Sequence, residues 1–152
     1  MAETTLVLGL GNTVMADDGV GPRVIGVLEQ RGGLPEGVAL LDGGTLGLDL
    51  LPRLEGVGRL IIVDAVEAGL PPGSLVRLTG DEVPLALETK VSPHQMGLKD
   101  LLAVARLVGQ LPPEIILLGI QPACIEMDTE LSAEVSARLP DLVATVRQEL
   151  GL

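Results

Sequence analysis

The sequence predicts a single-domain, three-layer α/β fold, in which helices cover both faces of one mostly parallel, twisted sheet. Short apolar runs alternate along the chain with stretches of helical periodicity, the pattern of strands joined by crossover helices. The clearest run, Arg59–Ala65, is apolar on both sides of Ile61-Ile62, as in a central parallel strand buried on both faces. The chain has 152 residues, the size of one domain, so we expect residues 1–152 to form one unit.

The elements follow in the order strand, helix, strand, helix, strand, hairpin, helix, strand, helix. Predicted strands cover about 5–10, 38–41, 59–65 and 114–120, and predicted helices cover about 20–30, 48–54, 97–108 and from 132 onward. Residues 74–79 predict a strand that pairs antiparallel or lies at an edge, and residues 81–92 show no clear period. Pro140 either kinks the last helix or splits it in two.

Three apolar stripes at helical spacing are expected to face the core. They are Val20, Val24, Val27 and Leu28 in the first helix; Leu98, Leu101, Leu102, Ala105 and Val108 in the third; and Leu131, Val135, Leu139, Leu142, Val146 and Leu150 in the last.

Composition excludes several classes of function. The formal net charge is −11 and the chain has no Phe, Tyr or Trp, which argues against binding nucleic acid through phosphates or base stacking. The one cysteine, Cys124, forms no internal disulfide and is expected to be an ordinary buried thiol. The N-terminal stretch lacks a basic region, and no apolar segment is long enough for a membrane span. We therefore expect a cytoplasmic protein without a membrane partner.

Residues 6–21, LVLGLGNTVMADDGVG, combine a strand, a glycine loop, two acids and the start of a helix. A dinucleotide-binding fingerprint would place glycine at the position of Val14, and a P-loop would need a lysine, which this stretch lacks. Two adjacent acids favour a cation or proton transfer over a phosphate. We expect Asp17 to cap the helix that follows, because a carboxylate there accepts backbone N–H groups, and we assign a functional role to Asp18.

Three acids follow the first three predicted strands: Asp18, Asp42 and Asp64. Ligands bind beyond the carboxyl ends of parallel strands, so we expect these side chains at one edge of the sheet. His94, the one histidine, lies in a loop that we expect to return to that edge. Carboxylates and an imidazole can bind a divalent metal, and two carboxylates can share a proton in acid–base chemistry. A turn-forming role is equally consistent with Asp42, and a structural role with His94.

Several segments, taken in order, resemble the hydrogenase maturation proteases, the endopeptidases that trim the C-terminal tail of the large subunit of nickel–iron hydrogenases. They are LVLGLGNTVMADDGVG, DGGTLGLDLL, IIVDA, SPHQMGLKDLL, GIQP and the Leu-Ser start of the last helix. The resemblance implies that Asp18, Asp64 and His94 bind nickel, which the large-subunit precursor carries as substrate rather than the protease as a permanent cofactor. It also implies an aspartic-type or a nickel-dependent endopeptidase, in which Asp18 or Asp64 is the catalytic base or the nickel polarises the peptide carbonyl or a water. The role of Asp42 is less settled.

Two other functions remain open from the sequence: a non-catalytic, nickel-binding assembly partner, and a nucleotide-binding α/β module, which the missing third glycine disfavours. We expect Asp64 to be a surface carboxylate, whose removal abolishes activity without unfolding the domain.

Overall fold

The computed structural model describes residues 4–44, 48–83 and 96–152, apart from the side chains of 48 and 96–100. In this part of the chain the sheet has five strands, in the order β2-β1-β3-β5-β4. Their bounds are β1 Thr4–Leu10, β2 Val38–Gly44, β3 Val57–Ala65, β4 Leu75–Thr79 and β5 Glu114–Ile120. Strands β1, β2, β3 and β5 are parallel, and β4 pairs antiparallel with β5 at the edge of the sheet. The predicted fold class and edge strand are thus confirmed.

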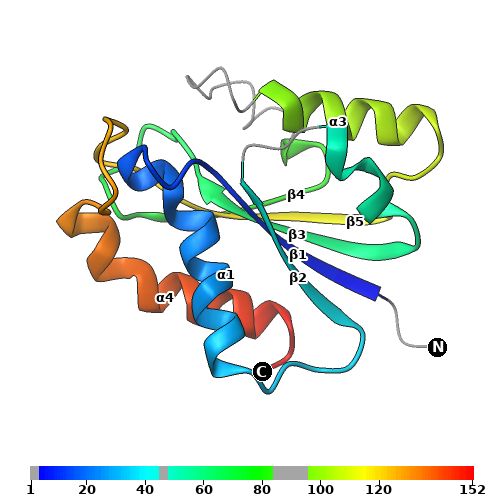
Figure 1. Ribbon diagram of the computed structural model, residues 1–152, viewed down its shortest axis with the longest axis horizontal. Coiled ribbons are helices and arrows are strands. Elements are labelled where there is room, and N and C mark those ends of the chain that lie inside the picture. The colour runs from blue at the N-terminus through cyan, green and yellow to red at the C-terminus, as the bar shows by residue number, and fades with distance from the viewer. Residues whose placement is uncertain (1–3, 45–47, 84–95) are drawn as a thin grey trace.

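Helices cover both faces of the sheet (Figure 1). Helices α1 (Val20–Arg31) and α4 (Ala133–Glu149) pack on one face, whereas α3 (Met96–Leu107) and the 3-10 helix η2 (Leu48–Leu54) pack on the other. A second 3-10 helix, η1 (Ala16–Gly19), leads directly into α1. Helix α4 continues through Pro140, so the alternative of two separate helices is wrong. Ser132 caps α4 through a bond that its side chain accepts from the Val135 N–H.

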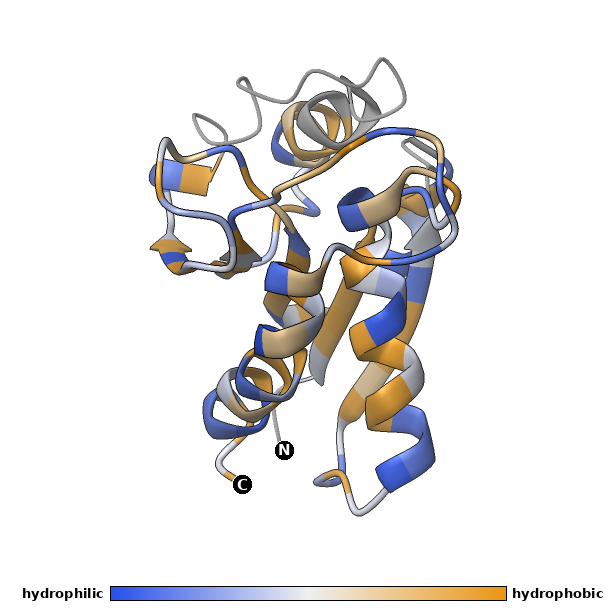
Figure 2. Ribbon diagram, turned by 90° about the vertical axis from the view of Figure 1, so that its left-hand side faces the viewer, coloured by the Kyte–Doolittle hydropathy of each residue, from blue (hydrophilic) through white to orange (hydrophobic). Residues whose placement is uncertain are grey.

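Each face of the sheet has its own aliphatic core, because successive residues of a buried strand point to opposite faces. On β3, Leu60 and Ile62 pack toward α3 and η2, whereas Ile61 and Val63 pack toward α1 and α4. Figure 2 shows apolar residues along the central strands and hydrophilic residues on the helices and loops around them. The two cores explain why the central runs lack polar alternation.

The predicted helix stripes mostly face these cores, with one error in α3. Leu101, Leu102 and Ala105 are buried as expected, but Val108 lies beyond the end of α3 and is 55% exposed. Leu98 is also expected to face the core, but it is one of the residues whose side chains the structure does not describe. Among the described residues, no helix has both the length and the apolar character needed to cross a bilayer.

The strand order creates a crevice at the ends of two neighbouring strands. From β1 the chain crosses to β2 through α1 on one face, and from β2 it reaches β3 through η2 on the opposite face. The carboxyl ends of β1 and β3 therefore lie next to each other where the connections diverge, which is where open α/β sheets bind ligands. We call the edge where the parallel strands end the carboxyl edge, and the opposite one the amino edge.

Candidate functional site

Asp18 and Asp64 lie at the carboxyl ends of the two strands that border this crevice. Asp18 follows β1 in η1 and is 2% exposed, and its Oδ2 accepts a hydrogen bond from the Asn12 N–H at 2.9 Å. Asp64 is near the end of β3 and is 1% exposed, and its Oδ1 accepts from the Ala65 N–H at 2.8 Å. The expectation that Asp64 is a surface carboxylate is wrong, because the strand that carries it is buried on both faces.

Glycines hold the segment that carries Asp18 against the end of β3. A Cβ on Gly21 would lie 2.5 Å from the carbonyl oxygen of Val63, the residue before Asp64. Gly11 has a φ of +132°, and a Cβ there would lie 1.7 Å from the carbonyl oxygen of Asp18. The glycines of this loop therefore serve close backbone packing, which places η1 beside the end of β3.

Asp17 does not cap the helix that follows it, which corrects the sequence prediction. Neither η1 nor α1 has a side-chain cap, and the fully buried carboxylate of Asp17 instead contacts the loop between β5 and α4. Oδ2 accepts from the N–H groups of Ala123 and Cys124 at 2.8 and 2.9 Å, and from the Ser132 hydroxyl at 2.8 Å. Oδ1 accepts from the Ser132 N–H at 2.7 Å. The two adjacent acids thus have different tasks: Asp17 anchors a loop, and Asp18 lies at the crevice.

Asp42 lies at the same edge, as expected, but it is exposed. Its backbone pairs with Gly9 of β1, and its Oδ1 accepts from the Gly44 N–H at 3.0 Å, the bond of a turn-forming aspartate. It also lines a small hollow of about 240 Å³, together with Gly11, Asn12, Thr13, Pro22 and Gly44. The turn-forming role is therefore present, and Asp42 lies near the end of β2, which is on the opposite side of β1 from β3 and Asp64.

The predicted third metal ligand, His94, lies outside the described residues, so the three-ligand site stays a prediction. Among the residues that are described, no three His, Cys, Asp or Glu side chains form a group that could hold a metal ion. What the structure contributes is two carboxylates, Asp18 and Asp64, at the ends of adjacent strands. Carboxylates are rarely buried without a functional or charge-balancing reason, and they can bind a cation or transfer a proton.

Sequence reasoning did not identify Gln121 as a structural residue of this edge. Its buried side chain accepts the N–H groups of Ala68 and Leu70 at 2.7 and 3.3 Å and donates to Glu67 at 2.8 Å. It therefore ties the loop after β3 to the end of β5. Cys124 is a free, half-buried thiol rather than a fully buried one.

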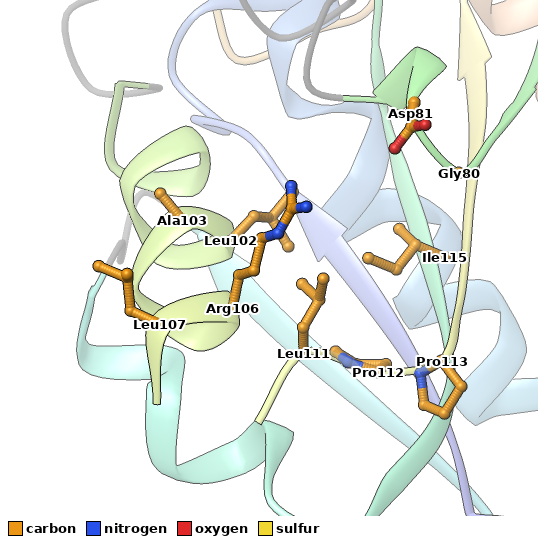
Figure 3. Close-up of a pocket in the computed structure, with 10 residues that line it drawn as sticks. All are labelled: Gly80, Asp81, Leu102, Ala103, Arg106, Leu107, Leu111, Pro112, Pro113 and Ile115. Carbon is orange, nitrogen blue, oxygen red and sulfur yellow. The ribbon is translucent and has the colours of Figure 1, made fainter. Parts of the chain in front are cut away.

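A larger hollow, of about 550 Å³, lies on the α3 side of the sheet, near the start of β5 (Figure 3). Leu102 and Arg106 of α3 line it from one side, and Leu111 and Ile115 from the other (Figure 3). Ile115 is the second residue of β5, so this hollow is at the amino edge, away from Asp18 and Asp64. Its lining is mainly apolar, which does not suit a site for a divalent cation.

Comparisons with known proteins agree with this architecture. The family model for hydrogenase maturation protease matches residues 22–149. The chain is 40% identical to the hydrogenase 2 maturation protease of Escherichia coli over 135 residues, covering 88% of this chain and 82% of that protein. It is 41% identical to the hydrogenase expression/formation protein HupD of Rhodobacter capsulatus, covering 97% of this chain and 71% of that one. The solved structure of the hydrogenase maturating endopeptidase HybD from E. coli superposes with a TM-score of 0.91, at 38% identity, over 97% of this chain and 91% of that chain.

Proposed function

This chain belongs to the hydrogenase maturation protease family, a family of endopeptidases, and we propose that it removes the C-terminal tail of a nickel-loaded hydrogenase large-subunit precursor. In this proposal Asp18, Asp64 and His94 bind the nickel that the substrate carries. The placement of Asp18 and Asp64 at the ends of β1 and β3 carries the proposal, because that crevice is where a sheet of this strand order binds its ligand.

The chemistry of the proposed metal ligands supports recognition of the precursor through its divalent nickel ion. Carboxylate oxygens and a neutral imidazole nitrogen are both suitable ligands for nickel. The glycine packing around Gly11 and Gly21 fixes η1 against β3, so the Asp18 backbone is positioned before the substrate arrives. A precursor without nickel would lack the ion that joins the two proteins, and the protease would leave it uncut.

Docking through the nickel would also position the scissile peptide. A peptide that is held next to the buried carboxylates reacts as if the step were intramolecular, which removes much of the entropic cost of the encounter. In the proposed step, Asp18 or Asp64 takes a proton from water, and the water oxygen attacks the peptide carbonyl carbon. The carbon–nitrogen bond then breaks, and the proton passes to the departing amine. This would make the enzyme an aspartic-type protease whose nickel belongs to the substrate, acting in the cytoplasm on a newly made subunit.

Cleavage of purified precursor, followed by mass spectrometry, tests the proposal. Four mixtures combine nickel-loaded or nickel-free precursor with the wild-type protein or His94→Ala. We expect a shortened precursor only with wild-type protein and nickel-loaded substrate. Equal cleavage in all four mixtures would overturn nickel docking, and a bound precursor of unchanged mass would instead support a non-catalytic assembly role.

The Asp64→Asn variant tests the assigned carboxylate. Since Asp64 is buried and near-isosteric with Asn, circular dichroism and urea unfolding are needed to show that the variant is folded. We expect a folded protein that does not shorten the nickel-loaded precursor and binds it more weakly than the wild type, because one charged nickel ligand is lost. Wild-type cleavage by a folded Asp64→Asn variant would remove Asp64 from the proposed mechanism.

A further inference from the structure

Two neighbouring loops at the carboxyl edge carry exposed apolar side chains. Val14 is 47% exposed, Ile125 39% and Met127 84%, and we call these three residues the apolar loop patch. The Asp128 N–H donates to the Val14 carbonyl at 3.0 Å, and the Ala16 N–H donates to the Asp128 carbonyl at 2.8 Å. The loop before α4 therefore lies directly against the turn that leads into α1, as Figure 1 also shows. The patch is a joint surface of two segments far apart in sequence.

The backbone under this patch is fixed. The buried Asp17 carboxylate binds Ala123 and Cys124 at the start of the loop and Ser132 at its end. The Asp17 N–H also donates to the Cys124 carbonyl at 3.0 Å, and the Arg23 guanidinium donates to the Thr129 carbonyl in between. Val14, Ile125 and Met127 are therefore held in solvent by an ordered backbone. Such pre-organised apolar residues favour association, because little entropy is lost when a partner covers them.

The charges around the patch define the partner further. Glu126 lies between Ile125 and Met127, Asp128 and Glu130 follow, and all three acids are exposed. Residues 122–132 include no Lys or Arg, and the Arg23 guanidinium is bound to the Thr129 carbonyl, so the rim of the patch is acidic on balance. An acidic rim around apolar side chains fits a protein surface with an apolar side chain flanked by Lys or Arg. Methionine is well suited to the centre of such a contact, because its flexible side chain adapts to the facing surface.

We infer that the apolar loop patch is a docking surface for the folded body of the large-subunit precursor, outside the tail that is cut. This inference rests on the proposed function, and the position of the patch supports that occupant. Val14 directly follows Thr13, which lines the small hollow beside Asp42 at the carboxyl edge, and Asp17, which anchors the loop, directly precedes Asp18. A substrate that presents its tail at Asp18 and Asp64 therefore lies next to the patch. The patch adds affinity for the precursor that the nickel contacts alone do not supply.

Binding to the precursor tests the inference in the Asp64→Asn background, in which cleavage does not interfere. The test variant combines Val14→Asn with Met127→Gln, two exposed positions whose change leaves the buried core intact. The control is Leu107→Gln, an exposed leucine (85%) at the end of α3, far along the chain from both loops. We expect the double variant to raise the dissociation constant for the nickel-loaded precursor about tenfold or more, and the control to leave it unchanged.

Two further measurements separate this inference from the proposed function. In the cleavage-competent protein, the double variant should raise KM for the nickel-loaded precursor while kcat stays the same, because the patch does not touch the scissile peptide. An unchanged dissociation constant in the double variant overturns the docking surface, whether or not the wild-type protein cuts the precursor. Binding that weakens as expected, without any cleavage by the wild-type protein, supports the surface and refutes the proposed protease reaction.

Discussion

Charged side chains have different hydrogen-bonding and ionic partners at the two edges of the sheet. Near the amino edge, charges neutralise one another: Arg59 pairs with Glu114 at 3.3 Å and with Glu149 at 2.6 Å, and Arg77 also pairs with Glu149. At the carboxyl edge, three aspartate carboxylates are buried, and their described hydrogen bonds come from backbone N–H groups and one hydroxyl. Ion pairs at a partly exposed edge contribute modestly to stability, whereas a buried carboxylate at a ligand-binding crevice is a candidate for a functional group.

A second contrast lies within the carboxyl edge, between Asp17 and Asp18. Both are buried and adjacent in sequence, yet Asp17 accepts four hydrogen bonds from one distant loop, whereas Asp18 lies at the crevice next to β3. Burial alone therefore does not identify a catalytic acid. The segment that supplies the hydrogen bonds distinguishes the two, because the bonds to Asp17 come from a loop that it holds in place.

Replacing the anchor should produce the largest loss of stability. Asp17→Ala removes a charged acceptor of four hydrogen bonds and leaves buried donors without a partner, so we expect the free energy of unfolding to fall by about 3–5 kcal/mol. Urea unfolding measures the change. The matched control is Asp141→Ala, an exposed aspartate paired with Arg138, which should change stability by about 0.5 kcal/mol or less. Similar losses for the two variants would contradict the anchoring role.

Two glycines of α1 give the next test, because one packs against the crevice and the other faces open space. A Cβ at Gly21 would lie 2.3 Å from the Leu10 carbonyl oxygen, whereas one at Gly26 would meet nothing within 4 Å. We expect Gly21→Ala to cost about 1–3 kcal/mol and to displace the segment that carries Asp18. Gly26→Ala should instead stabilise the protein by about 0.5–1 kcal/mol, because alanine favours the helix. Equal stability of the two variants, by thermal unfolding, would show that the close packing at Gly21 is unimportant.

The sequence was sufficient to predict the layers, because they depend on local patterns. Apolar runs such as EIILLGI have the length and composition of buried strands, and the stripe from Leu131 to Leu150 has helical periodicity, so these elements were found close to their observed bounds. The shared edge of Asp18, Asp42 and Asp64 followed from parallel strands alone.

The errors concern contacts between residues that are far apart in the chain. The partners of Asp17 are 106 to 115 residues away, so nothing in its neighbourhood distinguishes a loop anchor from a helix cap. The strand order, and hence the crevice between β1 and β3, depends on which faces α1 and η2 cover, and the alternation of elements does not specify it. The burial of Asp64 likewise depends on the packing of both cores.

The ion pairs of the amino edge should make stability depend on pH in acid. The pKa of Glu149 is lowered from the ordinary value of 4.5, first by the hydrogen bond from Arg77 and then by the charges of Arg77 and Arg59. A lowered folded-state pKa stabilises the protein above pH 4.5, and this contribution is lost as the pH falls through the folded-state value. Urea midpoints of the wild type and Glu149→Gln should therefore differ at neutral pH and converge in acid. The control is Glu36→Gln, at an exposed loop position, which should show no such convergence. If Glu149→Gln behaves like this control, the ion pairs contribute nothing to stability.

The smallest effect is expected at Asp42, the exposed acid of the carboxyl edge. Its carboxylate accepts one bond, from the Gly44 N–H, so Asp42→Ala should cost about 0.5–1 kcal/mol, by urea unfolding. Asp42→Asn should restore the wild-type value, because an amide oxygen can accept the same bond. Cleavage of the nickel-loaded precursor distinguishes a turn-forming residue from a residue of the active site. A loss of about tenfold or more in kcat/KM for Asp42→Asn, equivalent to about 1.4 kcal/mol, would show that the negative charge itself is necessary. Asp42 would then belong to the site with Asp18 and Asp64. Because Asp42 is exposed and already bound within its own turn, we expect no such loss.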